Sequence, residues 1–215
     1  MRQHVNPLSE FFQLPLRLPD KTILFKQPHY PIHIDIGSAK GEFLIELASK
    51  HSKWNFLGLD IREPLVVAAE RKRKKLALQN LKFLFCNANV SLDKWLLTLD
   101  YGQLKRVSIQ FPDPWFKRKH FKRRVLKSSF LNTIAKSLSK DGEFFIQSDV
   151  LKLIESMVEV VDRSNYFNRK TLNGKEWLDE NPYQVYTDRE IYVLTRDMPV
   201  YRAMFLRNNK LVNNS

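Results

Sequence analysis

The sequence HIDIGSAKGEFLIELASKHSKWNFLGLD, at residues 33–60, contains a complete strand–helix–strand unit. Its first four residues and the segment 56–59 are rich in β-branched, aromatic or large aliphatic side chains, which predicts a strand at each end. The helix expected between them, over residues 40–51, carries its apolar side chains on one face: Phe43, Leu44, Leu47 and Ala48. A parallel sheet is built from units of this kind.

The same alternation continues along the chain. Further strands are expected at 83–86, 107–111 and 144–146, and further helices at 64–79, 92–99, 128–138 and 151–164. Pro64 suits a first helical turn, and Gly142 is expected to cap the helix that ends at Leu138. Five strand–helix units predict a doubly wound α/β fold, with a mostly parallel sheet and helices on both faces. Composition also predicts strands at 191–195 and 203–206.

The length of 215 residues fits one domain with a full core. Residues 1–31 hold five of the ten prolines and no glycine, so we expect an irregular N-terminal extension there. Residues 32–215 are then the α/β domain. Neither segment contains an internal repeat or a low-complexity block.

The formal charge of +13, from 36 basic and 23 acidic residues, favours a polyanionic partner such as nucleic acid. The longest apolar run, at 65–69, is far shorter than the roughly 20 residues that cross a bilayer, so we expect no membrane partner. The N-terminus lacks a signal-peptide core, which favours the cytoplasm. The single cysteine, Cys86, excludes an internal disulfide, and five scattered histidines indicate no metal site.

Three predicted strands end in residues that suit a nucleotide-like ligand. The first runs into Asp35-Ile-Gly37-Ser-Ala-Lys-Gly41, in which Gly37 lets backbone approach a ligand closely. This D-x-G-x-x-x-G pattern differs from the G-x-G-x-x-G of NAD-binding proteins and resembles the first motif of Rossmann-like S-adenosylmethionine-dependent methyltransferases. Asp60 lies 23 positions after Gly37, which suits a ribose diol, and Asn87 could bind an adenine edge. Taken singly, each also reads as an ordinary turn residue.

The segment Phe111-Pro-Asp-Pro-Trp115 follows the fourth predicted strand. A proline on each side of Asp113 fixes the backbone and removes amide donors, so the carboxylate stands on a stiff loop at the mouth of the same cleft. A rigid turn with a buried tryptophan is the plainer reading of the same five residues.

Two basic runs flank this region. The run 117–127 has seven positive charges and no acid, and the run 71–75 has five. A charge run is often only a solvated surface, but beside a cleft in a +13 protein it favours phosphate binding. Trp115, Phe116 and Phe121 could stack on bases or pack in the core.

The motif Phe111-Pro-Asp-Pro-Trp-Phe-Lys117, followed by Lys119-His-Phe-Lys-Arg-Arg124, closely resembles the signature of bacterial tRNA (guanine-N7)-methyltransferases. The likeness continues through Gln147-Ser-Asp149 and Thr187-Asp-Arg-Glu190 and covers roughly residues 32–207. It implies a Rossmann-like class I fold and methyl transfer from S-adenosylmethionine to N7 of guanosine 46 in the tRNA variable loop.

The resemblance also implies site residues. The cofactor contacts would be Asp35, Asp60, Asn87 and Asp113, with Asp113 as the catalytic aspartate. The substrate-binding positions would be Lys117, Asp149, Thr187, Asp188, Arg189 and Glu190. The basic run adds expected contacts to the RNA backbone: Lys119, Lys122, Arg123 and Arg124. The resemblance further implies a helix over 188–196, against the strand that composition predicts.

Three departures from the family pattern stand out. Asp35 and Asp60 replace the longer Glu that is common there, Ala39 replaces a common Gly, and Asn87 replaces a usual Asp. An amide accepts a weaker hydrogen bond from an adenine amino group than a carboxylate does, so Asn87 is expected to bind adenine more weakly than an aspartate would.

Guanine N7 has a free lone pair and no proton to lose, so the reaction needs in-line placement and a suitable field more than a general base. We expect Asp113 to bind the base or to face the charge that develops on it. Asp149 and Glu190 would accept hydrogen bonds from guanine N1–H and N2–H₂. Cys86 is expected in the core.

Three other functions fit parts of the sequence. An amino-group methyltransferase would carry a D-P-P-Y type motif, whereas here a proline precedes the acid. A small-molecule methyltransferase would not need the two basic runs. A non-catalytic RNA-binding protein would gain nothing from carboxylates at Asp35, Asp60 and Asp113, and cofactor binding would separate it from the enzymes. The sequence leaves open a monomer or a homodimer.

Overall fold

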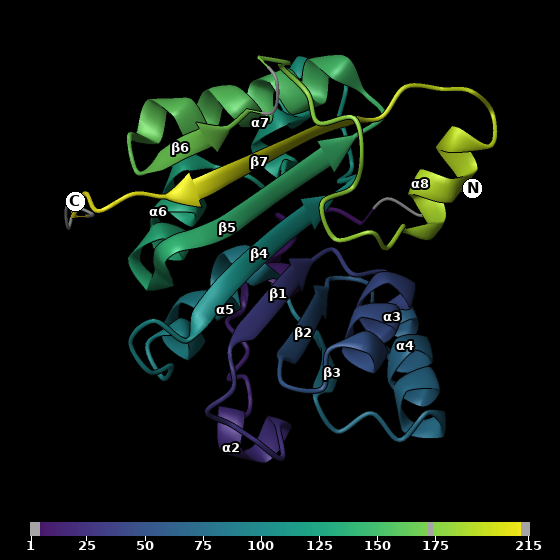
Figure 1. Cartoon of the computed structure of the whole chain (residues 1–215), viewed down its shortest axis with the longest axis vertical. Helices are drawn as coiled ribbons and strands as arrows, with labels where there is room; N and C mark the ends of the chain where they lie inside the picture. Colours follow the sequence, from purple (N-terminus) through teal and green to yellow (C-terminus); the bar gives the residue numbers. More distant parts are fainter. Residues whose placement is uncertain (1–4, 172–173, 212–215) are drawn as a thin grey trace.

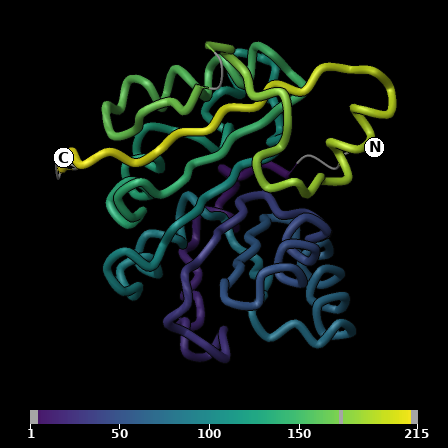
Figure 2. The backbone as a smooth tube through the Cα atoms, viewed as in Figure 1, coloured from purple at the N-terminus to yellow at the C-terminus, as the bar shows by residue number. Residues whose placement is uncertain are grey.

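The computed structural model describes residues 5–171 and 174–211. Its centre is a seven-stranded sheet in the order β3-β2-β1-β4-β5-β7-β6. The strands are β1 (Ile32–Ile36), β2 (Asn55–Asp60), β3 (Leu81–Phe85), β4 (Leu104–Gln110), β5 (Leu138–Ser148), β6 (Phe167–Lys170) and β7 (Tyr201–Arg207). The first five are parallel, and β7 runs antiparallel between β5 and β6, as the tube in Figure 2 traces.

Helices cover both faces of this sheet. On one face α3 (Glu42–Lys50) and α4 (Glu63–Lys75) pack against β2 and β3, and on the other lie α5 (Ala88–Leu96), α6 (Ser128–Ser137) and α7 (Leu151–Ser164). The helices that follow β1 and β2 lie on one face of the sheet, whereas the helices that follow β4 and β5 lie on the other. The winding of the chain therefore reverses between the adjacent strands β1 and β4. The doubly wound α/β prediction is confirmed. In such a sheet a ligand sits beyond the strand ends where the winding reverses.

The segment predicted as a strand at 191–195 is instead a helix, α8 (Asp188–Leu194). The prediction from composition was wrong, and the helix implied by the resemblance is confirmed. Its N-cap, Thr187, accepts a hydrogen bond from the backbone N–H of Glu190 at 3.1 Å. This T-x-x-E spacing is a local helix-start signal that outweighs the β-branched composition. Figure 1 shows α8 on the side toward which the arrows of β1 and β4 point.

The predicted cap at Gly142 was also wrong. Helix α6 ends at Ser137, and Gly142 lies inside β5, which begins at once with Leu138. The β4–β5 pairing shifts register near this point, and Asp141 there has a φ of 59°. The glycine therefore serves an irregular strand rather than a helix end. Strand β6 was not predicted, because its four residues, Phe-Asn-Arg-Lys, have no strand-like pattern.

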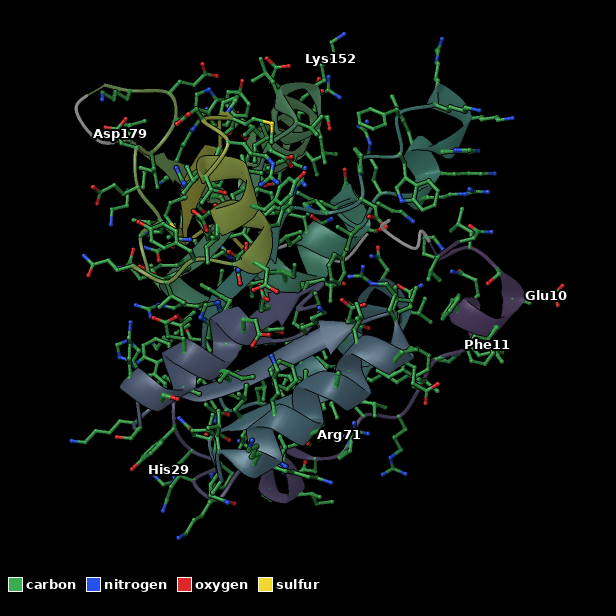
Figure 3. The ribbon with its side chains drawn as sticks, turned by 90° about the vertical axis from the view of Figure 1, so that its right-hand side faces the viewer. Glu10, Phe11, His29, Arg71, Lys152 and Asp179 are labelled. Carbon is green, nitrogen blue, oxygen red and sulfur yellow. The ribbon has the colours of Figure 1, made fainter. Side chains whose placement is uncertain are left out.

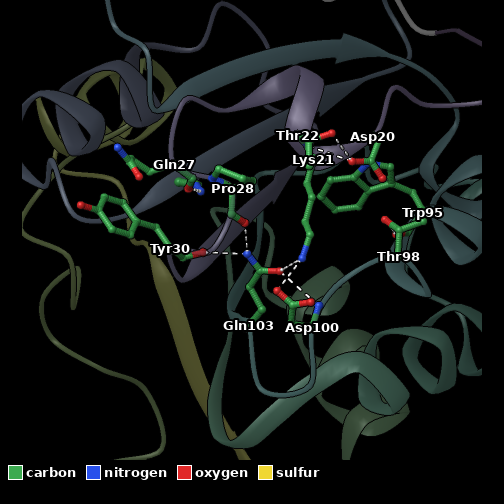
Figure 4. Close-up of polar contacts among 11 residues, drawn as sticks. Asp20, Lys21, Thr22, Gln27, Pro28, Tyr30, Trp95, Thr98, Asp100 and Gln103 are labelled. Atoms are coloured by element: carbon green, nitrogen blue, oxygen red, sulfur yellow. Dashed lines mark hydrogen bonds and ion pairs between the residues drawn. The ribbon is translucent and has the colours of Figure 1, made fainter.

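The N-terminal extension packs against the domain. It includes two short helices, α1 (Glu10–Gln13) and α2 (Lys21–Leu24). Lys21 forms an ion pair with Asp100 at 2.6 Å, and the Gln103 side chain donates to the carbonyls of Pro28 and Tyr30 (Figure 4). Leu24 and Phe25 of the extension are buried in the main core. Within residues 5–171 and 174–211 no helix is long and apolar enough to cross a membrane.

Candidate active site

A cleft of about 610 Å³ opens at the carboxyl ends of β1, β2 and β4. Its walls are the glycine loop after β1, the segment 60–62 after β2, the start of α5, and the loop after β4. Residues 187–189 at the start of α8 and several residues of the N-terminal extension complete it. The volume lies within the range of sites for small organic ligands. The ends of the first four strands, which the sequence singled out, therefore meet at one cavity.

The glycine loop brings backbone rather than side chain to the cleft. Gly37 has a φ of +84°, and a Cβ at this position would meet nothing within 4 Å. The open space beside its backbone is the room that a close ligand needs, while the positive φ favours glycine. Gly41, with a φ of +78°, is the N-cap of α3 and lies against the Phe83 ring.

Asp35 is buried at the carboxyl end of β1 and held by side chains of β4. Its Oδ1 accepts hydrogen bonds from Ser108 Oγ at 2.6 Å and from Gln110 Nε2 at 3.1 Å. Burial nevertheless raises the pKa of the carboxyl to about 6. A polar or positively charged ligand group in the cleft would favour the ionised form, so Asp35 is suited to bind one.

Asp60, at the end of β2, is almost completely buried and already partnered. Its two oxygens accept hydrogen bonds from Arg62 Nε and Nη2, both at 2.9 Å, and from the backbone N–H of Ala39 and Arg62. The hydrogen bonds to Asp60, with a smaller contribution from the charge of Asp113, raise the pKa of Arg62. Arg62 thus holds the carboxylate at the end of β2, and sequence reasoning missed it.

The loop after β4 is strained on both sides of Asp113. Phe111 and Trp115 have φ values of 46° and 45°, a region that bulky side chains rarely adopt. Pro112 and Pro114 stiffen the intervening turn. Strained backbone of this kind persists where the surroundings hold it and is common at functional sites. The predicted stiff loop is present, and Phe111, Asp113 and Trp115 line the cleft.

Asn87, expected to contact adenine, lies in the cleft wall as the N-cap of α5. Its Oδ1 accepts from the backbone N–H of Asn89 at 3.2 Å. Its Nδ2 donates to the carbonyls of Pro7 and Phe12 in the N-terminal extension, at 3.2 and 3.0 Å. The amide hydrogens of Asn87 are therefore directed at the extension.

The basic run divides into surface and structural residues. Lys117 precedes a 3₁₀ helix, η1 (Arg118–Arg123), and the side chains of Lys117, Lys119 and Lys122 are exposed outside the cleft. Arg123 lines the cleft and stacks over the Trp115 ring at 5.0 Å.

Arg124 also lines the cleft, but its guanidinium is bound by groups within the protein. It donates to the Pro114 carbonyl at 3.1 Å and to Ser156 Oγ at 2.9 Å, and it stacks over Phe121. Its guanidinium braces the loop after β4 against α7, and the predicted RNA contact of Arg124 stays a prediction.

The segment 187–190 also divides into residues that line the cleft and one residue that is buried in the protein. Thr187, Asp188 and Arg189 line the cleft, and Arg189 forms an ion pair with Asp149 beyond β5. Glu190 is fully buried, with Oε1 bound by Arg202 at 2.8 and 2.9 Å and Oε2 bound by Asn181 and Gln147. All lone pairs of Glu190 are thus taken up inside the protein, and its expected hydrogen bond to guanine is not available in this arrangement.

A chain of buried hydrogen bonds connects Asp35 in the cleft to Glu190 in α8. Gln147 donates to Glu190 at 3.0 Å and to Gln110 Oε1 at 2.7 Å, and Gln110 in turn donates to Asp35. The two glutamines lie at paired register positions near the ends of neighbouring strands, β4 and β5. Their place at strand ends was a signal available in the sequence, but their mutual contact depends on the register of the sheet.

Two features bear on the available chemistry. Cys86 is buried, and burial raises the pKa of its thiol to about 12, so the thiol stays protonated at neutral pH. Among the described residues, no group of three or more His, Cys, Asp or Glu side chains is placed to hold a metal ion. The cleft therefore offers carboxylates, amides, arginines and an open glycine loop for binding and placement.

Comparison with known proteins agrees with this chemistry. Residues 29–203 match a family described as putative methyltransferases. The chain is 68% identical over the full length of both chains to a tRNA (guanine-N(7)-)-methyltransferase of Prochlorococcus marinus strain NATL1A. It is 51% identical to a protein of the same description from Synechococcus sp. strain CC9902, over 97% of this chain and 89% of that one.

Solved structures share the fold at low sequence identity. The 16S rRNA methyltransferase KamB superposes with a TM-score of 0.57 at 12% identity, covering 85% of this chain and 90% of that one. The aminoglycoside resistance methyltransferase NpmB1 gives 0.54 at 15% identity, covering 87% and 90%. These likenesses show the fold alone, a Rossmann-like arrangement of the sheet and helices.

Proposed function

The chain belongs to the tRNA (guanine-N(7)-)-methyltransferase family, and we propose that it methylates N7 of guanosine 46 in the variable loop of cytoplasmic tRNA, using S-adenosylmethionine. The observation that carries the proposal is the meeting of Asp35, Asp60 and Asp113 around one cleft whose rim is basic. A cleft with carboxylates suits a nucleoside cofactor, and the basic rim suits a polyanion.

The residues of the cleft fit the cofactor. The open Gly37 backbone leaves room for a close approach, and the buried Asp35 carboxyl is placed for a polar or cationic group. Asp60 ends β2, where a ribose diol is expected. Its carboxylate would accept hydrogen bonds from the ribose hydroxyl groups in competition with those from Arg62. When bound, S-adenosylmethionine supplies an electrophilic methyl group on a sulfonium.

Methyl transfer to N7 needs no proton removal. The cofactor would supply the methyl group to the N7 lone pair and keep the electron pair of the S–C bond on sulfur, so positive charge would come to lie on the imidazole ring. Asp113, held on a strained and proline-flanked loop, offers a fixed negative charge to that ring. Preorganised charge of this kind lowers the barrier without reorganising during the reaction.

The tRNA would approach across the basic rim. Lys117, Lys119 and Lys122 are exposed and available to phosphates, while Arg123 stands at the cleft wall. Thr187, Asp188 and Arg189 face the cleft from α8, with Arg189 positioned by Asp149. Glu190 takes a positioning role, because it holds α8 through Arg202 rather than facing the cleft.

The test is transfer of labelled methyl from S-adenosylmethionine to an unmodified tRNA transcript, with mass mapping of the product nucleoside. A matched transcript with the variable-loop guanosine changed to adenosine is the control. We expect 7-methylguanosine in the first transcript alone. Label at another guanosine would reject position 46, label on another base would reject N7, and cofactor binding with no transfer to any RNA would reject the enzymatic function.

A further inference from the structure

The N-terminal extension supplies part of the cofactor cleft, and its attachment there is narrow. Residues 5–16 cross the start of α5, and Val5, Pro7, Leu8 and Gln13 line the cavity. Helix α1 contributes no buried residue, and Phe11 and Leu14 are about two-thirds exposed. Figure 3 shows Glu10 and Phe11 at the outer edge of the molecule. A segment with so little buried surface has low local stability, so its few contacts determine where it lies.

These contacts converge on the start of α5 and the end of β3. The Asn87 amide donates to two carbonyls of the segment, Ser91 Oγ accepts from the backbone N–H of Leu16 at 3.0 Å, and Phe11 and Phe12 pack on the Phe85 ring. Asn87 is the central attachment, because its two hydrogen bonds hold the segment at two points. They reach Pro7, in the turn that precedes α1, and Phe12, the third residue of the helix.

The orientation of the Asn87 amide is fixed by its capping role. Oδ1 must face the N–H of Asn89 to cap α5, which turns Nδ2 toward the extension. Oδ1 keeps a second lone pair that could accept a hydrogen bond from a ligand. An amide also provides two hydrogen-bond donors, which a carboxylate lacks. A carboxylate, which is usual at this position in the family that the sequence resembles, would cap the helix equally well and would repel both carbonyls.

We propose that Asn87 is a positioning residue for the cofactor site, whose side-chain amide fastens residues 5–16 as a wall of the cleft. The inference rests on the proposed use of S-adenosylmethionine. It explains why an amide is suitable here in place of the carboxylate. It also predicts that loss of the two donors weakens cofactor binding even though the acceptor oxygen is retained.

The experiment measures two properties of the full-length Asn87→Asp protein. Hydrogen exchange without cofactor reports the attachment of residues 5–16, and calorimetry with S-adenosylhomocysteine reports affinity. We expect faster exchange in residues 5–16 and affinity weakened about five- to ten-fold, as the loss of one or two hydrogen bonds implies. Asn89→Asp is the matched control, because Asn89 also lines the cleft but donates to Val125 at 2.9 Å, so exchange in residues 5–16 should be unchanged.

A double-mutant cycle identifies the route by which Asn87 acts. Phe11→Ser with Phe12→Ser loosens the segment without touching Asn87, and Asn87→Asp should then cause little further loss of affinity. An equal loss in both backgrounds would overturn the proposal, because Asn87 would then act on the adenine directly. Unchanged or tighter binding by Asn87→Asp would overturn it as well. If the protein proves not to methylate tRNA, the hydrogen-exchange and calorimetry results still test the role of Asn87, because neither experiment contains RNA.

Discussion

Asp113 tests the proposed mechanism at the scale of one residue. We expect Asp113→Ala to lower single-turnover methyl transfer by about 100-fold, the size of effect seen when one preorganised electrostatic group is removed. Affinity for S-adenosylhomocysteine should stay largely intact, because Asp35 and Asp60 remain in the cleft. Rapid-quench kinetics and calorimetry measure the two quantities. Equal losses in rate and affinity would instead identify Asp113 as a cofactor or scaffold residue.

Asp35 gives the site a pH dependence with a defined sign. Its pKa is raised to about 6 by burial, above its unfolded value near 3.8, so folding alone favours the protonated form and this carboxyl makes stability fall as pH rises between those values. Binding of a cofactor with donors and positive charge favours the carboxylate and releases the proton. Affinity for S-adenosylhomocysteine should therefore fall about ten-fold from pH 7 to pH 5.

Calorimetry at pH 5, 6 and 7 measures this dependence, and Asp35→Asn is the control. The variant should bind more weakly at pH 7 but show an almost flat profile, because it has no titrating group at this position. A pH profile for Asp35→Asn parallel to that of the native chain would assign the proton to another residue.

At the scale of one element, Glu190 decides where α8 lies. Its ion pair with Arg202 is fully buried, so Glu190→Gln leaves a buried guanidinium without its charge partner. We expect the free energy of unfolding to fall by about 3 kcal/mol, as is usual when one member of a buried pair is removed. Urea denaturation measures the loss, and the KM for tRNA should rise because Thr187 and Arg189 are displaced with the helix.

The double variant Glu190→Met with Arg202→Met is the matched control. Removing both charges should recover a large part of the stability, since no buried charge is then unpaired. It should not recover tRNA binding if the polar network places α8. Loss of tRNA binding by Glu190→Gln at native stability would contradict the positioning role and return Glu190 to the substrate contacts first expected.

The charge of the whole molecule should govern tRNA affinity through salt. Replacing Lys119 and Lys122 by Ala should reduce the slope of log Kd against log salt concentration by about 1.5, because each phosphate contact contributes about 0.7 to 0.9. Filter binding across a salt series measures the slope. The control replaces Arg71 and Lys75, two exposed residues near the far end of α4, where Figure 3 labels Arg71.

The control pair should leave the slope almost unchanged, since Leu65 is the last residue of α4 that lines the cleft. An equal change for both pairs would extend the RNA footprint along α4. An unchanged slope for the Lys119 and Lys122 pair would remove η1 from the RNA-binding surface.

The sequence alone determined six of the seven strands of the sheet, most of its helices and the location of the cleft. These follow from local causes: the periodicity of apolar side chains places strands and helices, and parallel strands bring their carboxyl ends to one edge. Asp35, Asp60, Asn87 and Asp113 could be selected because each stands near the carboxyl end of a strand. Predictions failed where one local signal opposed another, as in α8, or where a glycine has more than one use, as at Gly142.

Only the tertiary structure decided what the side chains at that edge do. Glu190 and Arg189 are neighbours in sequence, yet one is buried against Arg202 and the other faces the cleft, because successive residues of a helix point in different directions. Asn87 faces an extension about 80 residues earlier in the chain, and Gln110 meets Gln147 through strand register. Hydrogen bonds between residues far apart in sequence arise from packing, and no local pattern encodes them.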